Sequence, residues 1–162
     1  MSFKTLSLSK PPPARTYWVG FSGGLDSTVL LHRLKREGFK PRAVHIHHGL
    51  QTAADEWARH CCSVCKKLKV PFTLVRVHVA AKSKAGPESA ARDARYAALR
   101  KQMKPGDCLV TAHHADDQAE TLLLRLLRGS GVQGLAAMRT VSDVSPGKLW
   151  RPLLETPRDE IR

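Results

Sequence analysis

Residues 16–28 read TYWVGFSGGLDST. The apolar run Thr16–Phe21 predicts a strand, and the segment from Asp26 to Glu37 predicts a helix that ends at Gly38, with Pro41 shortly beyond. Two glycines lie between the strand and the helix, and glycine permits backbone conformations that other residues resist. A strand, a glycine turn and a helix in this order are typical of a unit that binds a ligand beyond the carboxyl end of a parallel strand.

Short apolar runs and longer segments of helical period continue to alternate along the chain. Further strands are expected at Ala43–Ile46, Phe72–Val77 and Cys108–Ala112. Further helices are expected at Ala53–Leu68, from Gly86-Pro87 onward, and at Asp116–Arg128. Strands that alternate with helices of this length imply βαβ units. We therefore expect an α/β fold, with a doubly wound, mostly parallel sheet and helices on both of its faces.

Size and charge narrow the class of protein. With 162 residues, of which 42% are hydrophobic, the chain is long enough for one domain but not for two large ones. Its 27 Lys and Arg against 14 Asp and Glu give a net charge of +13, which favours a polyanionic partner, with nucleic acid as the leading class. Basic residues that serve only solubility are the alternative. No apolar run approaches the length of about 20 residues that a membrane span needs, and the N-terminus lacks an apolar signal core, so we expect a cytoplasmic protein with no membrane partner.

The loop between the first strand and the first helix has the chemistry of an anion site. Its glycines allow backbone amides to point at an anion, and the start of the helix adds a partial charge of about +0.5. Ser22, Ser27 and Thr28 add hydroxyl groups. The loop lacks the lysine that ends the phosphate loop of kinases and GTPases. We therefore expect a different kind of loop that holds phosphate oxygens.

The hexad Ser22-Gly23-Gly24-Leu25-Asp26-Ser27 resembles the pyrophosphate loop of the N-type ATP pyrophosphatases, the PP-loop superfamily. The resemblance implies a Rossmann-like fold of the adenine nucleotide alpha hydrolase type, and cleavage of ATP between its α and β phosphates. It also implies that the hexad binds the pyrophosphate of ATP and that Asp26 places magnesium, a hard cation that prefers carboxylate and phosphate oxygens. ATP and magnesium are therefore the expected cofactors.

Four further motifs follow the hexad: His47-His48-Gly49-Leu50; Glu88 with Arg92, Arg95 and Tyr96; His113-His114 with Asp116, Asp117, Gln118, Glu120 and Thr121; and Arg151-Pro152-Leu153-Leu154. Together with the hexad, over about residues 17 to 162, they resemble the tRNA-lysidine synthetase family. The resemblance implies an ATP-dependent ligase that joins L-lysine to the wobble cytidine of the CAU anticodon of tRNA(Ile). The reaction passes through an adenylated cytidine and gives lysidine. The implied partners are tRNA(Ile) and L-lysine.

The same resemblance implies a role for each group of motif residues. The catalytic residues would be Asp26, Arg92 and His113. Arg92 would stabilise charge on the activated cytidine and the α phosphate, a task that suits an arginine fork better than a lysine. The residues that line the adenosine or the tRNA would be His47, His48 and Arg95. The lysine-binding residues would be Asp116, Asp117 and Glu120, whose carboxylates offer a counter-charge to its amines.

Several of these residues also have a purely structural interpretation. Glu88, Arg92 and Arg95 are spaced by four and three residues, so they could form a ladder of ion pairs on one helix face. At least one of the two adjacent aspartates is expected to cap its helix. Five histidines near the strand ends raise the alternative of a zinc site, namely His45, His47, His48, His113 and His114. We disfavour it because strand histidines are often hydrogen-bonded structural groups.

The cysteines and the leucine run are expected to be structural. Cys62 and Cys65 form one C-x-x-C pair, as in some redox and iron–sulfur sites, but the pair lies within an amphipathic helix and no second pair exists. We therefore expect packed free thiols. The leucines expected in the core, rather than in a partner groove, are Leu122, Leu123, Leu124, Leu126 and Leu127.

Three segments are expected along the chain. Residues 1–15, with three consecutive prolines, would be a flexible tail, and residues 16–154 would be the PP-loop ATPase catalytic domain. Residues 155–162 would be the start of a truncated helix, capped by Thr156, or a linker to C-terminal tRNA-binding domains. Two other functions stay open: another PP-loop tRNA-modifying enzyme such as a tRNA thiolase, and a nucleotide- or RNA-binding module without turnover. A homodimer also stays open.

Overall fold

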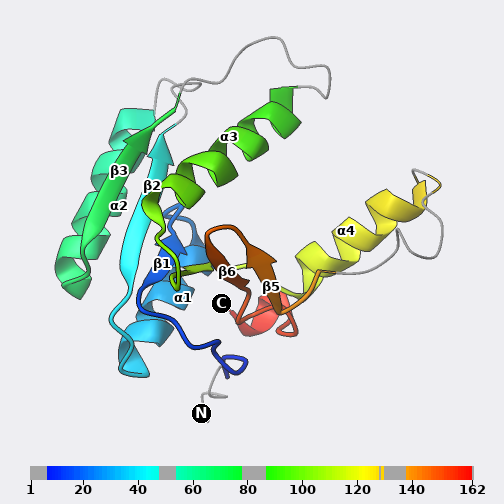
Figure 1. The fold of residues 1–162 in the computed structure, drawn as a ribbon, viewed down its shortest axis with the longest axis horizontal. Helices are drawn as coiled ribbons and strands as arrows, with labels where there is room; N and C mark the ends of the chain where they lie inside the picture. Colours follow the sequence, from blue (N-terminus) through cyan, green and yellow to red (C-terminus); the bar gives the residue numbers. More distant parts are fainter. Residues whose placement is uncertain (1–6, 48–53, 78–86, 128, 130–137, 162) are drawn as a thin grey trace.

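The computed structural model of the chain describes residues 7–47, 54–77, 87–127, 129 and 138–161, with residues 87–92 described by their backbone alone. In chain order the elements are β1 (Tyr17–Gly20), α1 (Leu25–Arg36), β2 (Arg42–His47), α2 (Ala54–Leu68), β3 (Phe72–Arg76), α3 (Pro87–Gln102), β4 (Cys108–Val110), α4 (Ala115–Leu127), β5 (Val141–Val144), β6 (Gly147–Trp150) and the short 3-10 helix η2 (Arg158–Glu160). Figure 1 shows their arrangement. The expected strands and helices up to α4 are all present, with ends that differ by one or two residues.

The strands form one six-stranded sheet in the order β3-β2-β1-β4-β6-β5. All neighbouring strands are parallel except β5 and β6, which are antiparallel. The chain adds strands outward from β1 to β3, and α3 then carries it back to the other side of β1, where β4 pairs. This reversal confirms the doubly wound fold. It lies between β1 and β4, and a reversal of strand order is where open α/β sheets bind their ligands.

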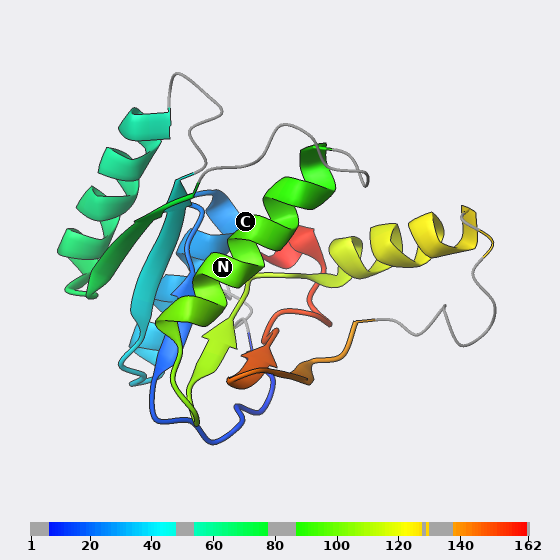
Figure 2. The same cartoon turned by 45° about the horizontal axis from the view of Figure 1, so that its top comes forward.

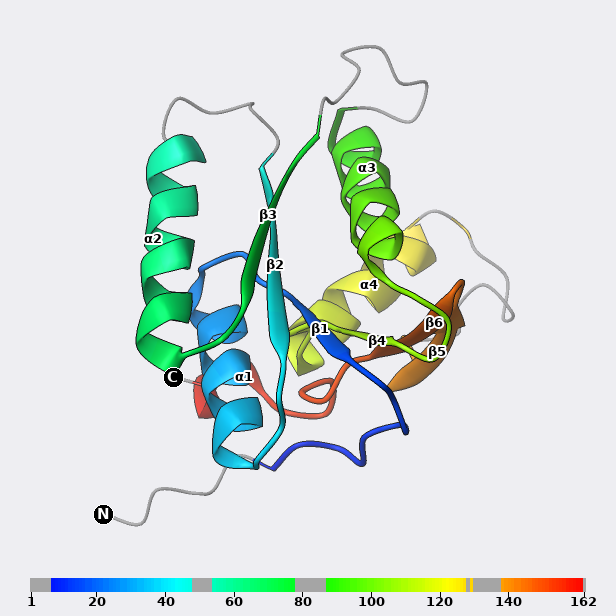
Figure 3. The same cartoon turned by 60° about the vertical axis from the view of Figure 1, so that its left-hand side comes forward.

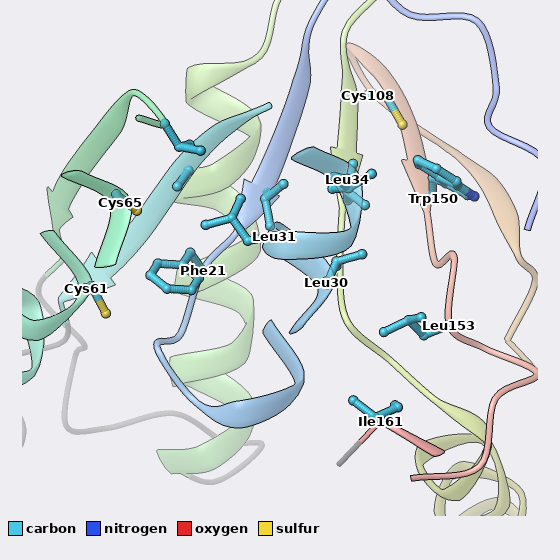
Figure 4. Packing of buried hydrophobic residues seen from close by; sticks show 14 residues of the cluster. Phe21, Leu30, Leu31, Leu34, Cys61, Cys65, Cys108, Trp150, Leu153 and Ile161 are labelled. Carbon is cyan, nitrogen blue, oxygen red and sulfur yellow. The ribbon is translucent and has the colours of Figure 1, made fainter. Parts of the chain in front are cut away.

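Helices cover both faces of the sheet, with α1 and α2 on one side and α3 on the other (Figure 3). On the first face Leu31 of α1 and Cys61 of α2 pack in one cluster with Phe21, as Figure 4 shows. On the second face Leu99 of α3 packs in a cluster with Leu109 of β4. Burial of an aliphatic or aromatic side chain contributes about 1.5–3 kcal/mol to stability, so these two clusters hold the loops at the strand ends in place.

Residues 7–15 lie along the body of the protein instead of forming a free lead-in. The backbone N–H of Ser9 donates to the carbonyl of Pro152 over 3.1 Å, and the indole of Trp150 donates to Ser9 Oγ over 2.9 Å. The prolines of this segment have no N–H group to donate, so the N–H groups of Ser9 and Arg15 and the Pro12 carbonyl, which accepts from the Tyr17 hydroxyl, anchor it instead. Residues 1–6 lie outside the described residues.

The hairpin of β5 and β6 has no counterpart among the expected strands. Each strand has four residues and includes polar side chains, Ser142 and Asp143 in β5 and Lys148 in β6. Neither therefore forms the apolar run that identifies the similarly short β1 and β4. The hairpin is held instead by pairing of β6 with β4, in which Leu109 lies opposite Leu149. After β6 the Arg151-Pro152-Leu153-Leu154 motif turns into the body, where Leu153 is fully buried. Near the end of the chain η2 has Pro157 at its N-cap position, without a side-chain cap, so Thr156 is not the cap.

The prediction that the leucines of α4 lie in the core was wrong. No residue of α4 is buried, and the exposed fraction of Leu127 reaches 84%. Figures 1 and 2 show the helix projecting away from the sheet. An apolar stripe becomes buried only where another element packs on it, and most of α4 extends beyond the described strands. Among the described helices, none combines the length and the apolar character needed to cross a bilayer.

Candidate functional site

Two loops meet at the carboxyl ends of β1 and β4. The two strands are parallel neighbours, with Val19 opposite Val110, so the residues that follow them begin side by side. After β1 comes the hexad of residues 22–27, which we call the phosphate loop. After β4 come His113-His114 and the first turn of α4. The strand order therefore brings together two motifs that are far apart in the sequence.

Hydroxyl groups close the phosphate loop. Ser22 Oγ lies 3.0 Å from Ser27 Oγ and accepts a hydrogen bond from the N–H of Gly24 over 3.3 Å, while Thr28 Oγ1 donates to the Gly24 carbonyl over 2.9 Å. Helix α1 then begins at Leu25 with Gly24 as its N-cap, which has no side chain to accept from the first-turn amides. Such amides, with the helix dipole behind them, form an anion site. The geometry thus supports the expected phosphate-binding chemistry of the loop.

Gly23 is the position where the loop requires glycine. Its φ of +81° lies in the left-handed region, and a Cβ added there would lie 2.6 Å from Cys61 Sγ and 3.3 Å from Trp57 Nε1. A carbon atom cannot approach sulfur that closely, so a larger residue would displace the loop or α2. Helix α2 therefore packs directly against the phosphate loop.

Replacing Gly23 with alanine should lower the free energy of unfolding by about 2–4 kcal/mol. About 1–2 kcal/mol comes from the left-handed backbone and the rest from the contact with Cys61. Gly38→Ala is the matched control, because Gly38 has a φ of +84° and no atom within 4 Å of an added Cβ. Urea unfolding of both variants measures the difference. Equal losses for the two would contradict a steric role of Cys61.

A buried histidine links the phosphate loop to the start of α4. The His114 side chain is 7% exposed, and its Nε2 lies 3.7 Å from Asp26 Oδ2 and 3.5 Å from Asp117 Oδ2. Its Nδ1 lies 3.9 Å from Asp116 Oδ1. We call these four residues the acid cluster. An imidazole N–H group between carboxylates lowers their mutual repulsion, so His114 allows acids from two loops to lie close together.

Asp26 has an oxygen suited to a cation. Its Oδ2 faces His114, whereas its buried Oδ1 has no hydrogen-bond partner among the described residues. A buried carboxylate oxygen without a partner is costly unless a ligand supplies one. Magnesium is commonly bound by one or two carboxylates together with substrate phosphates, so Asp26 within the phosphate loop fits it. Within the described part of the chain, no group of three or more His, Cys, Asp or Glu is placed to hold a metal ion.

The carboxylates of α4 differ in their existing contacts. Asp116 Oδ1 accepts the backbone N–H of Arg158 over 3.1 Å, and Asp117 Oδ2 accepts the backbone N–H of His114 over 2.9 Å. The second contact caps the start of α4, as expected for at least one of the two aspartates. Glu120 lies one turn after Asp116 and is exposed. It is therefore open to a soluble amine.

The two described histidines expected at the site lie at different points of this edge of the sheet. His113 Nδ1 lies 2.9 Å from Thr111 Oγ1, on the loop that follows β4. His47 is buried at the end of β2, and its Nε2 lies 3.1 Å from Asp55 Oδ1 without the alignment of a hydrogen bond. Arg76 also pairs with Asp55, over 3.1 Å. His47 therefore faces the start of α2 and lies apart from the acid cluster.

The arginines expected at the site are on α3. Burial lowers the pKa of the His45 imidazole, a hydrogen bond to the Phe21 carbonyl opposes that shift, and the charge of Arg95 is among the smaller causes that lower it. Arg95 of α3 therefore lies close enough to affect the imidazole of His45 in β2. Arg92 belongs to the part of α3 described by its backbone alone, and His48 lies outside the described residues, so both assignments remain predictions.

Four residues at the site had no functional role assigned from the sequence: His114 in the acid cluster, and His45, Trp57 and Cys61 beside the phosphate loop. The local sequence around Cys61 predicts only a packed helix residue, and Cys61 is indeed buried in α2. Burial raises the pKa of Cys61 to about 11 and that of Cys65 to about 12, so both remain thiols at neutral pH. All four cysteines are free. Three of them, Cys61, Cys65 and Cys108, are buried among the packed side chains of the core.

A phosphate loop after β1, beside an acid cluster in a doubly wound sheet, defines an α/β nucleotide-binding protein. The family model described as the PP-loop domain matches residues 1–162. The chain belongs to this PP-loop domain family, which supports the use of ATP.

Curated proteins that resemble the chain are named tRNA(Ile)-lysidine synthase. The one from Alkalilimnicola ehrlichii is 54% identical over 155 residues, which is 93% of this chain and 35% of the relative. The one from Pseudomonas putida is 53% identical over 154 residues, which is 92% of this chain and 36% of the relative. The chain thus spans about a third of the length of these relatives.

Solved structures share the fold at much lower identity. The U34-tRNA thiolase NcsA from Methanococcus maripaludis matches with a TM-score of 0.70 at 19% identity, over 96% of this chain and 58% of that one. The NH3-dependent NAD synthetase from Campylobacter jejuni matches with a TM-score of 0.60 at 16% identity, over 93% of this chain and 62% of that one. These similarities confirm the expected Rossmann-like fold of the adenine nucleotide alpha hydrolase type.

Proposed function

We propose that the chain is the ATP-binding catalytic part of a tRNA(Ile)-lysidine synthase, which joins L-lysine to the wobble cytidine of the CAU anticodon of tRNA(Ile). The observation that carries the proposal is the acid cluster, because His114 lies 3.7 Å from Asp26 and 3.5 Å from Asp117. Asp26 of the phosphate loop and Asp117, whose carboxylate is suited to an amine, thus belong to one cluster. The identity of 54% to a relative of that name supports the substrates.

The first step would be adenylation of the cytidine. Its O2 attacks the α phosphate of ATP, the bond from the α phosphorus to the bridging oxygen breaks, and pyrophosphate leaves into the phosphate loop. Amides of the first turn of α1 and the hydroxyls of Ser22 and Ser27 would hold the leaving group. Asp26 would hold magnesium, which supplies positive charge to the phosphates. Arg92 would stabilise charge on the α phosphate and the base.

The second step would be attack by lysine. Its side-chain amine bonds to C2 of the adenylated ring and loses a proton, and AMP departs with the former O2, which leaves lysidine. Asp117 and Glu120, together with Asp116, would bind the lysine by charge. His113 would be a catalytic residue that contacts the reacting groups. The main contribution of the chain to catalysis would be to position the substrates.

The tRNA would lie over the same edge of the sheet. His47, His48 and Arg95 would line the adenosine or the tRNA, and the net charge of +13 would favour the tRNA backbone. In this proposal the enzyme acts in the cytoplasm, and assembly as a homodimer remains a prediction.

Release of pyrophosphate from ATP is the measurement that tests this function. With magnesium and lysine present, a tRNA(Ile) transcript with a CAU anticodon should stimulate release by the chain, and the methionine tRNA with the same anticodon should not. Stimulation by neither transcript, with ATP still bound, would instead favour a nucleotide-binding module without turnover. Release that depends on a sulfur donor in place of lysine would favour a tRNA thiolase.

A further inference from the structure

The underside of the phosphate loop is held by three side chains from other elements. The Ser22 carbonyl accepts a hydrogen bond from the Trp57 indole and another from the Cys61 thiol, over 3.6 Å, both on α2. The preceding carbonyl, that of Phe21, lies 2.8 Å from His45 Nδ1. Since a carbonyl oxygen can only accept, this ring nitrogen carries the proton. Two successive carbonyls, that of Phe21 just before the loop and that of Ser22 within it, therefore point at β2 and α2 respectively.

These contacts also set the direction of the loop amides. A trans peptide is planar, and its C=O and N–H groups point in opposite directions. The Ser22 carbonyl shares its peptide with the N–H of Gly23, so a carbonyl held toward α2 turns this N–H away from α2. The Phe21 carbonyl shares its peptide with the N–H of Ser22, which is turned in the same way. Gly23 can follow this path because its φ is +81°.

The position of Trp57 is explained by the hydrogen bond of its indole N–H and not by burial of its ring. Its side chain is 49% exposed, so it is not a core residue, and its ring stacks on His60 with centroids 5.2 Å apart. Its polar edge points inward at the loop, whereas a half-exposed tryptophan could satisfy that N–H with water. Cys61 beside it is fully buried, and its sulfur already limits the space at Gly23. Ring and thiol together fix one peptide plane.

We propose that Trp57 is a positioning residue of the phosphate loop. Its indole N–H, assisted by the Cys61 thiol, holds the peptide between Ser22 and Gly23 so that the Gly23 N–H points at the pyrophosphate of ATP. The inference rests on the proposed function in one respect, that the loop binds pyrophosphate. Trp57 acts through the backbone and does not itself touch the phosphates.

The variant Trp57→Phe tests this role, because it keeps an aromatic ring and removes the N–H. Calorimetric titration of the whole chain with inorganic pyrophosphate and magnesium should show binding weakened about 5- to 15-fold, as for one lost hydrogen bond. Binding of AMP, which lacks the leaving phosphates, should change less than about 2-fold. Cys61→Ala should show a smaller loss, and the double variant should lose less than the sum because both groups donate to one carbonyl.

Trp18→Phe is the matched control. The Trp18 indole also donates one hydrogen bond, to Asp107 Oδ2 over 3.1 Å, away from the loop. Trp18→Phe should lower the melting temperature about as much as Trp57→Phe does. It should leave pyrophosphate binding unchanged. Equal weakening of pyrophosphate and AMP by Trp57→Phe, or no weakening of either, would overturn the positioning role alone. A wild-type chain that binds ATP through its nucleoside but does not bind pyrophosphate would overturn the assignment of the loop itself.

Discussion

Replacing Asp26 with asparagine should lower the rate of pyrophosphate release about 1000-fold and leave the fold intact. The carboxylate would hold the cation that neutralises the leaving group, and loss of such a preorganised charge costs about 100- to 1000-fold or more. Stability should not fall, because Asp26 Oδ1 has no hydrogen-bond partner in the described structure and the amide removes a charge near two other carboxylates. The rate is measured by assaying released pyrophosphate in samples stopped at successive times. The stability is measured by thermal unfolding.

The matched control for Asp26→Asn is Asp143→Asn. Asp143 is exposed on β5 and pairs with Lys148 over 2.8 Å, so the same chemical change there should cost no activity and little stability. Retained pyrophosphate release by Asp26→Asn would exclude Asp26 as the magnesium ligand. A large loss of melting temperature would show instead that Asp26 holds the acid cluster together.

Replacing Glu120 with glutamine should raise the KM for lysine about 10- to 100-fold and change the KM for ATP less than about 2-fold. A charge-assisted hydrogen bond contributes about 1.5–3 kcal/mol, and the amide keeps the shape of the side chain while losing its charge. Formation of adenylated tRNA without lysine isolates the first step, and it should be unaffected. Product formation over a range of lysine concentrations then reports on the second step.

Glu56→Gln is the control for this second prediction. Glu56 lies in the first turn of α2 and is exposed, as Glu120 of α4 is. Its nearest basic partner in the described structure is Arg59, at 3.9 Å. It should affect neither substrate. Equal effects of Glu120→Gln on ATP and on lysine would argue against a lysine-binding role. Asp117→Asn is less selective, because Asp117 also caps α4 through the N–H of His114.

In the proposed function, the acid cluster would bring the two half-reactions into one site. Asp26 lies in the first turn of α1 and Asp117 in the first turn of α4, and each helix start follows one of two neighbouring parallel strands. His114 lies between their carboxylates and is almost fully buried. A shift of either helix would therefore displace a carboxylate that contacts His114. In the proposed reaction this contact would keep the leaving group and the attacking amine in a fixed relation.

Much of the fold was predictable because local signals agree. The glycine turn, the strand before it and the helix after it reinforce one another between Thr16 and Glu37, and the structure has the strand and helix within a residue of their expected ends. The hairpin of β5 and β6 was not predictable, since polar residues such as Asp143 and Lys148 interrupt both strands and leave no apolar run. The leucines of α4 have the pattern of a buried face, yet the pattern alone does not specify a partner.

The sequence by itself determined the phosphate loop, the alternation of strands and helices, and the order of the motifs, because each depends on residues within one turn or one element. Only the tertiary structure decided which distant side chains meet there. His114 links Asp26 to α4 because β1 and β4 are neighbours in the sheet, and Trp57 reaches the Ser22 carbonyl because α2 packs beside the end of β1. Strand order and helix packing depend on the whole core, so no local pattern encodes such contacts.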